Sequence, residues 1–78
     1  MAVVRFFAAA EEAVGSDRED RSERTLGELR ATLLEEHPAL HGVLSHCAVL
    51  VEGSRADDDD HPIAADALVD VLPPFAGG

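Results

Sequence analysis

The chain contains no lysine and only one cysteine, and these two shortages limit the chemistry that it can carry. Without lysine it offers no side-chain amine that could accept an isopeptide bond. Cys47 has no second cysteine with which to form an internal disulfide, and no C-x-x-C pair is present. We therefore expect no structural zinc site and no bound metal, because such sites are usually built from paired ligands.

Basic charge and long apolar runs are also scarce. Six arginines stand against 16 acidic residues, which gives a formal net charge of −10 at pH 7. This balance repels phosphate backbones and anionic lipids, so we expect neither nucleic acid nor a membrane as a partner. No apolar run approaches the roughly 20 residues of a membrane span, and no signal-peptide pattern opens the sequence. These features predict a soluble, cytoplasmic protein.

What is present is enough for one small domain. The chain has 78 residues, of which 46% are apolar. A chain of this length holds a single compact unit with a small core, and no internal repeat divides it.

An opening strand is predicted over residues 1–8, which are rich in β-branched and aromatic side chains. Side chains alternate between the two faces of a strand, and the charge of Arg5 marks one of these faces as the wetter one. The buried face holds Val4 and Phe6, and the wetter face holds Val3, Arg5 and Phe7.

Two helices follow this strand. Residues 8–14 are good helix formers and end at a glycine, whereas residues 16–24 are too polar to bury anything and allow at most a weak edge strand. Thr25 and Glu28 fit a capping box, which predicts the start of the main amphipathic helix over residues 26–37. Its apolar stripe consists of Leu26, Leu29 and Leu33.

The second half of the chain predicts more strands. Residues 38–46 form a connection anchored by Val43 and Leu44, and the apolar run over residues 47–51 predicts a buried strand in which Cys47 packs as a small hydrophobe. After the turn a short return strand is expected over residues 54–56. The four-aspartate run then reads as a solvated loop, because it lacks the spacing of a calcium-binding loop. The last strand covers residues 67–72, with Ala67, Val69 and Val71 on one face.

This order of elements predicts an α+β domain of the β-grasp, or ubiquitin-like, type, in which a mixed sheet packs on one main helix. We assign the domain to residues 1–72 and a flexible C-terminal tail to residues 73–78. Six extended residues reach at most about 20 Å, and glycine lets backbone pass through a narrow channel. The tail consists of Pro73, Pro74, Phe75, Ala76, Gly77 and Gly78.

The reactive group of this tail is the carboxylate of Gly78. An ionised carboxylate is a poor electrophile, so chemistry there requires an activated acyl form such as an acyl-adenylate, which implies a partner that uses ATP. In a β-grasp sheet the first and last strands are parallel neighbours, which brings Phe7 and Leu72 together beside the tail. With Phe75 they form a predicted partner-binding patch.

Four segments together resemble one known family over essentially the whole chain. They are VRFFAAAEEAVG, TLGELRATLLEEHPAL, VLVEG and, most specifically, DALVDVLPPFAGG. The chain resembles the MoaD group of the MoaD/ThiS sulfur carriers. Members of this MoaD group are the small subunits of molybdopterin synthase. One departure is Glu52-Gly53, where the family usually has Asn-Gly in the turn.

The resemblance implies a function. An E1-like adenylyltransferase of the MoeB type would adenylate Gly78, and a sulfur donor protein would convert the adenylate to a thiocarboxylate. The tail would then enter a MoaE-like large subunit and deliver sulfur to the pterin precursor of the molybdenum cofactor. The chain would thus be a carrier subunit without a bound cofactor or its own catalytic groups, while ATP is used by the activating partner.

Three alternatives stay open. A ThiS- or Urm-like carrier would serve another pathway, such as thiamine synthesis or tRNA thiolation. A ubiquitin-like modifier would ligate Gly78 to lysines of other proteins. A plain binding module would have an inert tail and would stay active without Gly78.

Overall fold

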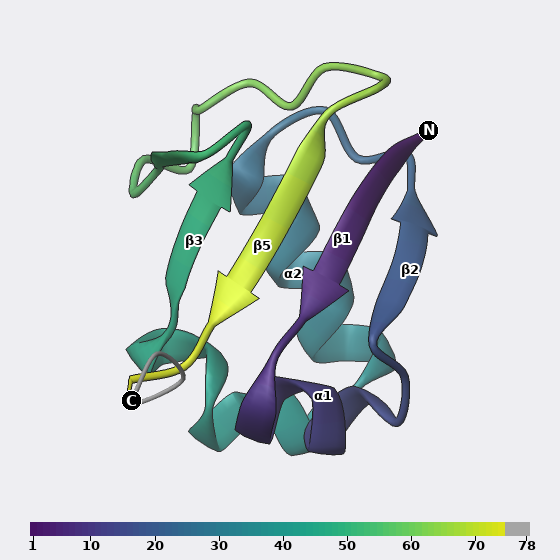
Figure 1. The fold of residues 1–78 in the computed structure, drawn as a ribbon, viewed down its shortest axis with the longest axis vertical. Helices are drawn as coiled ribbons and strands as arrows, with labels where there is room; N and C mark the ends of the chain where they lie inside the picture. The colour runs from purple at the N-terminus through teal and green to yellow at the C-terminus, as the bar shows by residue number, and fades with distance from the viewer. Residues whose placement is uncertain (75–78) are drawn as a thin grey trace.

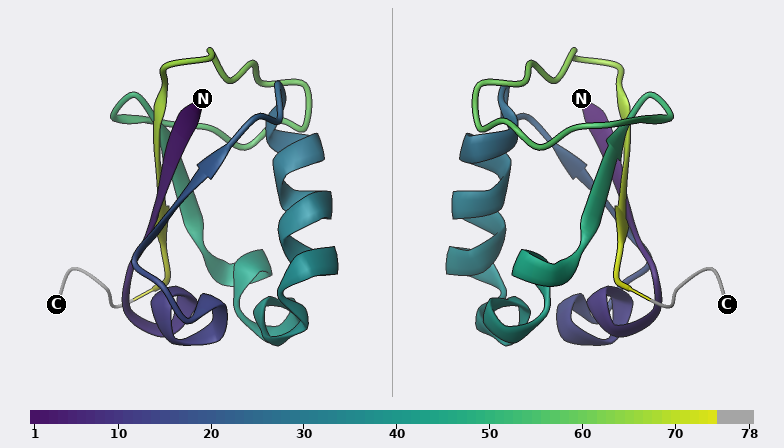
Figure 2. Two further views of the ribbon diagram at one scale, coloured as in Figure 1. Left: turned by 90° about the vertical axis from the view of Figure 1, so that its right-hand side faces the viewer. Right: turned by 90° about the vertical axis from the view of Figure 1, so that its left-hand side faces the viewer.

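The computed structural model describes residues 1–74, and it shows the predicted β-grasp (Figure 1). Five strands form one sheet in the order β2-β1-β5-β3-β4, in which β1 and β5 pair in parallel and the other pairs are antiparallel. Helix α2 lies across one face of this sheet, whereas α1 lies at the end of the sheet where β1 and β5 finish (Figure 1 and Figure 2). The elements are β1 (Ala2–Phe6), α1 (Ala8–Val14), β2 (Arg18–Arg21), α2 (Leu26–Glu36), the 3-10 helices η1 (Pro38–Gly42) and η2 (Leu44–His46), β3 (Ala48–Val51), β4 (Ser54–Arg55) and β5 (Leu68–Leu72).

The strand and helix patterns of the sequence account for most of the core. Val4 and Phe6 of β1 and Val69 and Val71 of β5 are buried toward α2, as their alternation predicts. The apolar stripe of α2 is buried against them. Among the described residues, every buried side-chain nitrogen and oxygen has a hydrogen-bond partner. The small core therefore carries no uncompensated polar group.

The caps of both helices follow from their sequences. Gly15 ends α1 in the left-handed conformation with φ +85°, and its N–H donates to the carbonyl of Glu11. At the start of α2 the Thr25 hydroxyl accepts the Glu28 N–H at 3.2 Å. The Glu28 carboxylate accepts the N–H of Arg24 at 3.3 Å, one residue earlier than in a standard capping box.

Two expectations for the middle of the chain need correction. The connection after α2 is anchored by the buried Leu44, as expected, and also by Leu40, which the prediction missed and which is fully buried, whereas Val43 is only half-buried and packs against the core. Strand β3 is buried on one face only, since Val49 and Val51 face α2 and its other side chains are half-buried on the opposite side. An apolar run of this length does not distinguish a strand buried on both faces from one with a partly exposed apolar face.

The turn between β3 and β4 explains why Glu52 is acceptable there. Glu52 and Gly53 both have positive φ, at +52° and +81°, as a tight two-residue hairpin turn requires. The Glu52 carboxylate accepts the N–H of Leu68 at 2.9 Å, and the Glu52 N–H donates to the Leu68 carbonyl at 2.8 Å. The turn is thus bonded to the beginning of β5.

The acidic loop over residues 57–60 has exposed side chains, as expected, but its backbone is fixed to the start of α2. The Gly27 N–H donates to the carbonyl of Asp59 at 2.9 Å. Arg30 reaches the carbonyl of Asp57 at 3.1 Å and the carboxylate of Asp59 at 3.3 Å. A Cβ atom at Gly27 would lie 2.8 Å from the Cβ of Asp59, so glycine is required for this close approach.

Replacing this glycine is therefore expected to destabilise the fold. Gly27→Ala should lower the free energy of unfolding by about 1–2 kcal/mol, because the loop must move away from α2 and lose its backbone contacts. Thermal denaturation measures the effect. Gly42→Ala is the matched control, because nothing lies within 4 Å of a Cβ atom at that position. Equal midpoints for the two variants would contradict the close approach.

Within residues 1–74, no helix is both long enough and apolar enough to cross a membrane.

Candidate functional site

The chain leaves the sheet from its central strand. Strand β5 lies between β1 and β3, and the N–H of Phe7 donates to the carbonyl of Val71 at 3.2 Å near its end. Pro73 is buried and Pro74 is exposed, and neither has an N–H with which to extend the ladder. The tail therefore starts at a fixed point of a rigid body. Phe75, Ala76, Gly77 and Gly78 lie outside the described residues, so their roles stay predictions.

The sheet face opposite α2, which we call the outer face, is not covered by either helix (Figure 2). Pairing registers and alternation assign side chains of all five strands to it. The central strands contribute Val3, Arg5, Ala48, Leu50, Leu68, Asp70 and Leu72, and the two edge strands contribute Arg18, Asp20 and Arg55.

Phe7 and Leu72 meet at the tail end of this outer face. The last pair of the β1–β5 register joins Phe6 to Val71, so the two predicted residues follow it side by side. Both are half-buried rather than fully exposed. The guanidinium carbon of Arg5 lies 5.6 Å from the centre of the Phe7 ring, which is within cation–π range. The two side chains are thus neighbours, and Arg5 shields one of them.

Arg5 and Asp70 form a two-pronged ion pair in the middle of the outer face. Arg5 Nε donates to Oδ1 of Asp70 at 2.6 Å, and Nη2 donates to Oδ2 at 2.9 Å. The Arg5 side chain is 40% exposed and that of Asp70 only 15%. The hydrogen bond to Asp70 raises the pKa of Arg5. In the sequence, Arg5 and Asp70 each indicate only that one face of their strand is solvent-exposed. The strand register makes them direct partners, and this pairing shows that their charges neutralise each other.

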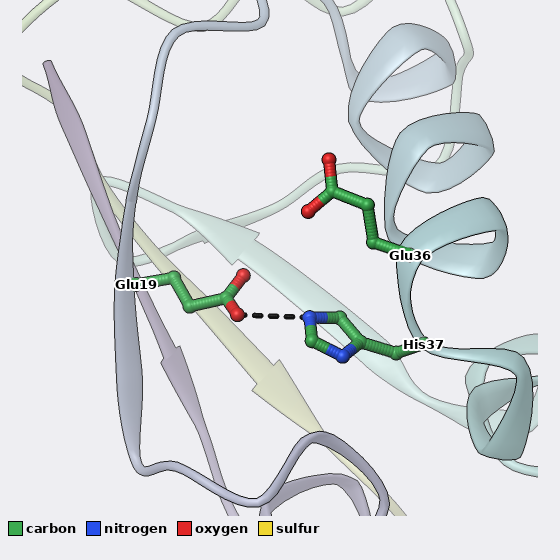
Figure 3. A group of neighbouring side chains, drawn as sticks. All are labelled: Glu19, Glu36 and His37. Atoms are coloured by element: carbon green, nitrogen blue, oxygen red, sulfur yellow. Dashed lines mark hydrogen bonds and ion pairs between the residues drawn. The ribbon is translucent and has the colours of Figure 1, made fainter.

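A second charged group lies on the helix side of the sheet, where β2 meets the end of α2 (Figure 3). We call it the edge clasp: Glu19, Arg21, Glu23, Glu36 and His37. Arg21 donates to all three carboxylates, most closely to Glu23 and Glu36 at 2.8 Å each. Its side chain is only 10% exposed. As predicted, none of residues 16–24 is fully buried, but the Arg21 side chain is largely covered, and its three acidic partners compensate its charge.

The charges of the edge clasp support one another. Hydrogen bonds to Glu23 and then to Glu36 raise the pKa of Arg21. The same bonds from Arg21 lower the pKa of both glutamates. His37 Nε2 lies 2.8 Å from the second oxygen of Glu19 and so ties β2 to the first residue after α2 (Figure 3). The clasp therefore fastens the edge strand to the helix.

Three atoms of the edge clasp have metal-ligand character, since the ligand atoms of Glu19, Glu36 and His37 lie within 4.8 Å of one another. Arg21 already donates to the carboxylates of Glu19 and Glu36, at 3.2 Å and 2.8 Å. A metal ion would therefore have to sit beside a permanent positive charge that uses the same carboxylates. This arrangement favours a structural clasp over a metal centre.

Cys47 has the properties of a packing residue. It is half-buried, and its thiol donates to the carbonyl of Val43 at 3.3 Å. Burial raises the pKa of this thiol, which lowers the fraction of nucleophilic thiolate at neutral pH.

Comparison with known proteins extends these observations. A model of the ThiS family matches residues 4–78. The fold is similar to the crystal structure of SAMP1 from Haloferax volcanii, with 30% identity and a TM-score of 0.76 over 99% of this chain and 98% of that one. No curated protein gives a significant match.

Two further similar structures carry molybdopterin-related descriptions. One is a complex of subunits 1 and 2 of the molybdopterin-converting factor from Helicobacter pylori, with 28% identity and a TM-score of 0.76 over 99% of this chain and 97% of that one. The other is described as molybdopterin converting factor, subunit 1, from Pyrococcus furiosus. At 18% identity and a TM-score of 0.84, over 95% of this chain and 97% of that one, it supports the fold alone.

Proposed function

Because this chain belongs to the ThiS family, we propose that it carries sulfur as a thiocarboxylate on the C-terminal carboxylate of Gly78. We further propose that it serves as the small subunit of a molybdopterin synthase. The observation that carries the proposal is the way the chain ends. A central strand stops at Pro73-Pro74, and a short tail with two terminal glycines follows.

The chemistry requires one activating enzyme and one sulfur donor. A Gly78 oxygen attacks the α-phosphate of ATP, which forms an acyl-adenylate and releases pyrophosphate. A persulfide sulfur from the donor then attacks the acyl carbon, and AMP leaves. A second thiol, of the donor protein or in solution, attacks the donor sulfur of the resulting acyl disulfide, which frees the thiocarboxylate and leaves a disulfide between the two thiols. Its sulfur stays ionised at neutral pH, whereas an ordinary cysteine thiol is mostly protonated. The carrier therefore holds a soft nucleophile ready to attack a pterin precursor.

The proposed contribution of this chain is placement rather than catalysis. The rigid sheet presents the tail at Pro74, and Phe7 and Leu72 lie beside its starting point. We propose that these two residues, with Phe75, contact both an E1-like adenylyltransferase and a MoaE-like large subunit. The complex of two subunits seen for the similar Helicobacter pylori protein supports a large-subunit partner.

Intact-mass measurement tests the proposal. The chain is incubated with ATP, an E1-like adenylyltransferase and a persulfide donor, and its mass is compared with that of a reaction without ATP. We expect a gain equal to the exchange of one oxygen for sulfur, which depends on ATP. An unchanged mass in the presence of an enzyme active on another carrier would contradict the sulfur-carrier function.

A second function is favoured by the likeness to SAMP1, a protein described among the similar structures as a small archaeal modifier. In that case the activated Gly78 carbonyl would be attacked by a lysine amine of another protein. Blotting of cell extracts for a tagged chain separates the two functions. Covalent conjugates that resist thiol reductants would indicate a modifier, whereas a free thiocarboxylated chain alone would indicate a carrier.

A further inference from the structure

The centre of the outer face is polar, although the side chains next to it on β5 and β3 are apolar. Asp70 is paired with Arg5 on one side and with Leu50 of β3 on the other, and it is flanked along β5 by Leu68 and Leu72. Its side chain is 15% exposed in the free chain. This carboxylate thus lies between aliphatic side chains and is hydrogen-bonded to the guanidinium of Arg5.

We infer that the Arg5–Asp70 pair is a self-neutralised centre of the surface covered by the adenylating partner, and that this partner meets it with apolar groups rather than with a charge of its own. The inference rests on the proposed function, because it concerns the enzyme that acts on Gly78. Both carboxylate oxygens of Asp70 are already hydrogen-bonded by Arg5, at 2.6 Å and 2.9 Å. The pair can therefore lose its water without a new ionic partner.

The position of the tail identifies the adenylating enzyme as the occupant. Asp70 and Pro73 lie on the same short stretch of chain, so the outer face and the start of the tail form one rigid surface. From Pro74 to Gly78 the chain reaches at most about 14 Å even when fully extended. An enzyme that holds the Gly78 carboxylate must therefore stand close to the end of β5, where the outer face begins.

The distribution of charged residues also favours approach of the enzyme to the outer face. The outer face carries three of the six arginines but only two of the 16 acidic residues, Asp20 and Asp70. The remaining surface is strongly acidic. An enzyme that holds the polyphosphate of ATP beside Gly78 meets the least repulsion along this face.

Three variants and one control test the inference through the dissociation constant for the adenylyltransferase that modifies the unaltered chain. Asp70→Ala and Arg5→Leu each leave one charge without its partner under the covering enzyme. Each should weaken binding on the order of 30-fold or more. The double variant removes both charges and should bind within a few-fold of the unaltered chain. Asp59→Ala breaks the Arg30–Asp59 contact between α2 and the acidic loop, away from the outer face, where the Asp59 side chain is 77% exposed, and should leave binding unchanged.

Titration calorimetry without ATP gives the dissociation constants of the unaltered chain and of the four altered chains, and thermal unfolding confirms that each variant is folded. The inference would be overturned if the double variant bound the enzyme as weakly as the weaker-binding single variant. That result would show that the enzyme contacts one of the two charges directly. Unchanged binding in both single variants would overturn it as well, but would leave a sulfur-carrier function intact. If the unaltered chain is neither bound nor modified, the proposed function fails with it.

Discussion

A chain that lacks Gly78 is expected to lose thiocarboxylate formation by more than about 100-fold. The deletion leaves a carboxylate on Gly77, but this group ends about 3.5 Å short of the original position. Misplacement of a reacting atom by as little as about 1 Å can cost on the order of 100-fold in rate. The time course of the mass gain in the reconstituted reaction measures the loss.

The position of the terminal carboxylate, rather than the mere presence of a terminal glycine, should be what matters. A chain extended by one additional glycine also ends in a glycine carboxylate, but this group lies beyond the position of the Gly78 carboxylate. The extended chain should therefore react as poorly as the shortened one. Neither change removes a residue of the described fold, so the unfolding midpoint serves as the control and should stay constant. A shortened chain that gains sulfur at the normal rate would show that the carboxylate position is not read by the enzyme.

The largest effect on stability is expected from Arg21→Met, which removes the cation of the edge clasp. Glu19, Glu23 and Glu36 would then face one another without compensation, at side-chain exposures of 23%, 15% and 49%. Loss of one partner from a fully buried pair costs about 3–5 kcal/mol, and partial exposure reduces this to about 2–3 kcal/mol. For a domain of this size, such a loss lowers the unfolding midpoint by roughly 10–20 °C.

The effect should depend on pH in a defined direction. Arg21 lowers the pKa of Glu23 and Glu36 below the ordinary value of 4.5, so their contribution is complete above that value. It is lost as the pH falls through the lowered pKa. The difference in unfolding free energy between the unaltered chain and Arg21→Met should therefore be full at pH 7 and shrink below pH 4.5. Arg55→Met, at an exposed ion pair, is the control and should change stability by less than about 0.5 kcal/mol.

Local rules predict much of this fold. The alternation in residues 67–72, the leucine spacing of α2 and the glycine after α1 each act over a few residues, and the structure confirms all three elements. Strand β2 is the exception among the strands. Its sequence, Arg-Glu-Asp-Arg, has no apolar face, and its inward side chains are held by ion pairs with α2 instead.

The candidate site is only partly predictable for a related reason. The ending in two glycines is visible directly, and the neighbourhood of Phe7 and Leu72 follows from the β-grasp topology. The Arg5–Asp70 pair joins residues 65 positions apart, and its formation depends on an exact strand register. Likewise, the role of Leu40 depends on how η1 folds back after Pro38. Such long-range pairings have no signature in a local window of sequence.

The parallel pairing of β1 with β5 also determines when the sheet can form during synthesis of the chain. Strand β5 is the middle of the sheet, and β1 has no other neighbour on that side until the last part of the chain has been synthesised. Pairings between distant segments close large loops and form late, so this domain cannot mature segment by segment during translation. The complete sheet therefore forms only after β5 has been synthesised. The proposed recognition of the outer face by an activating enzyme would thus select chains that contain β5 over chains truncated before it.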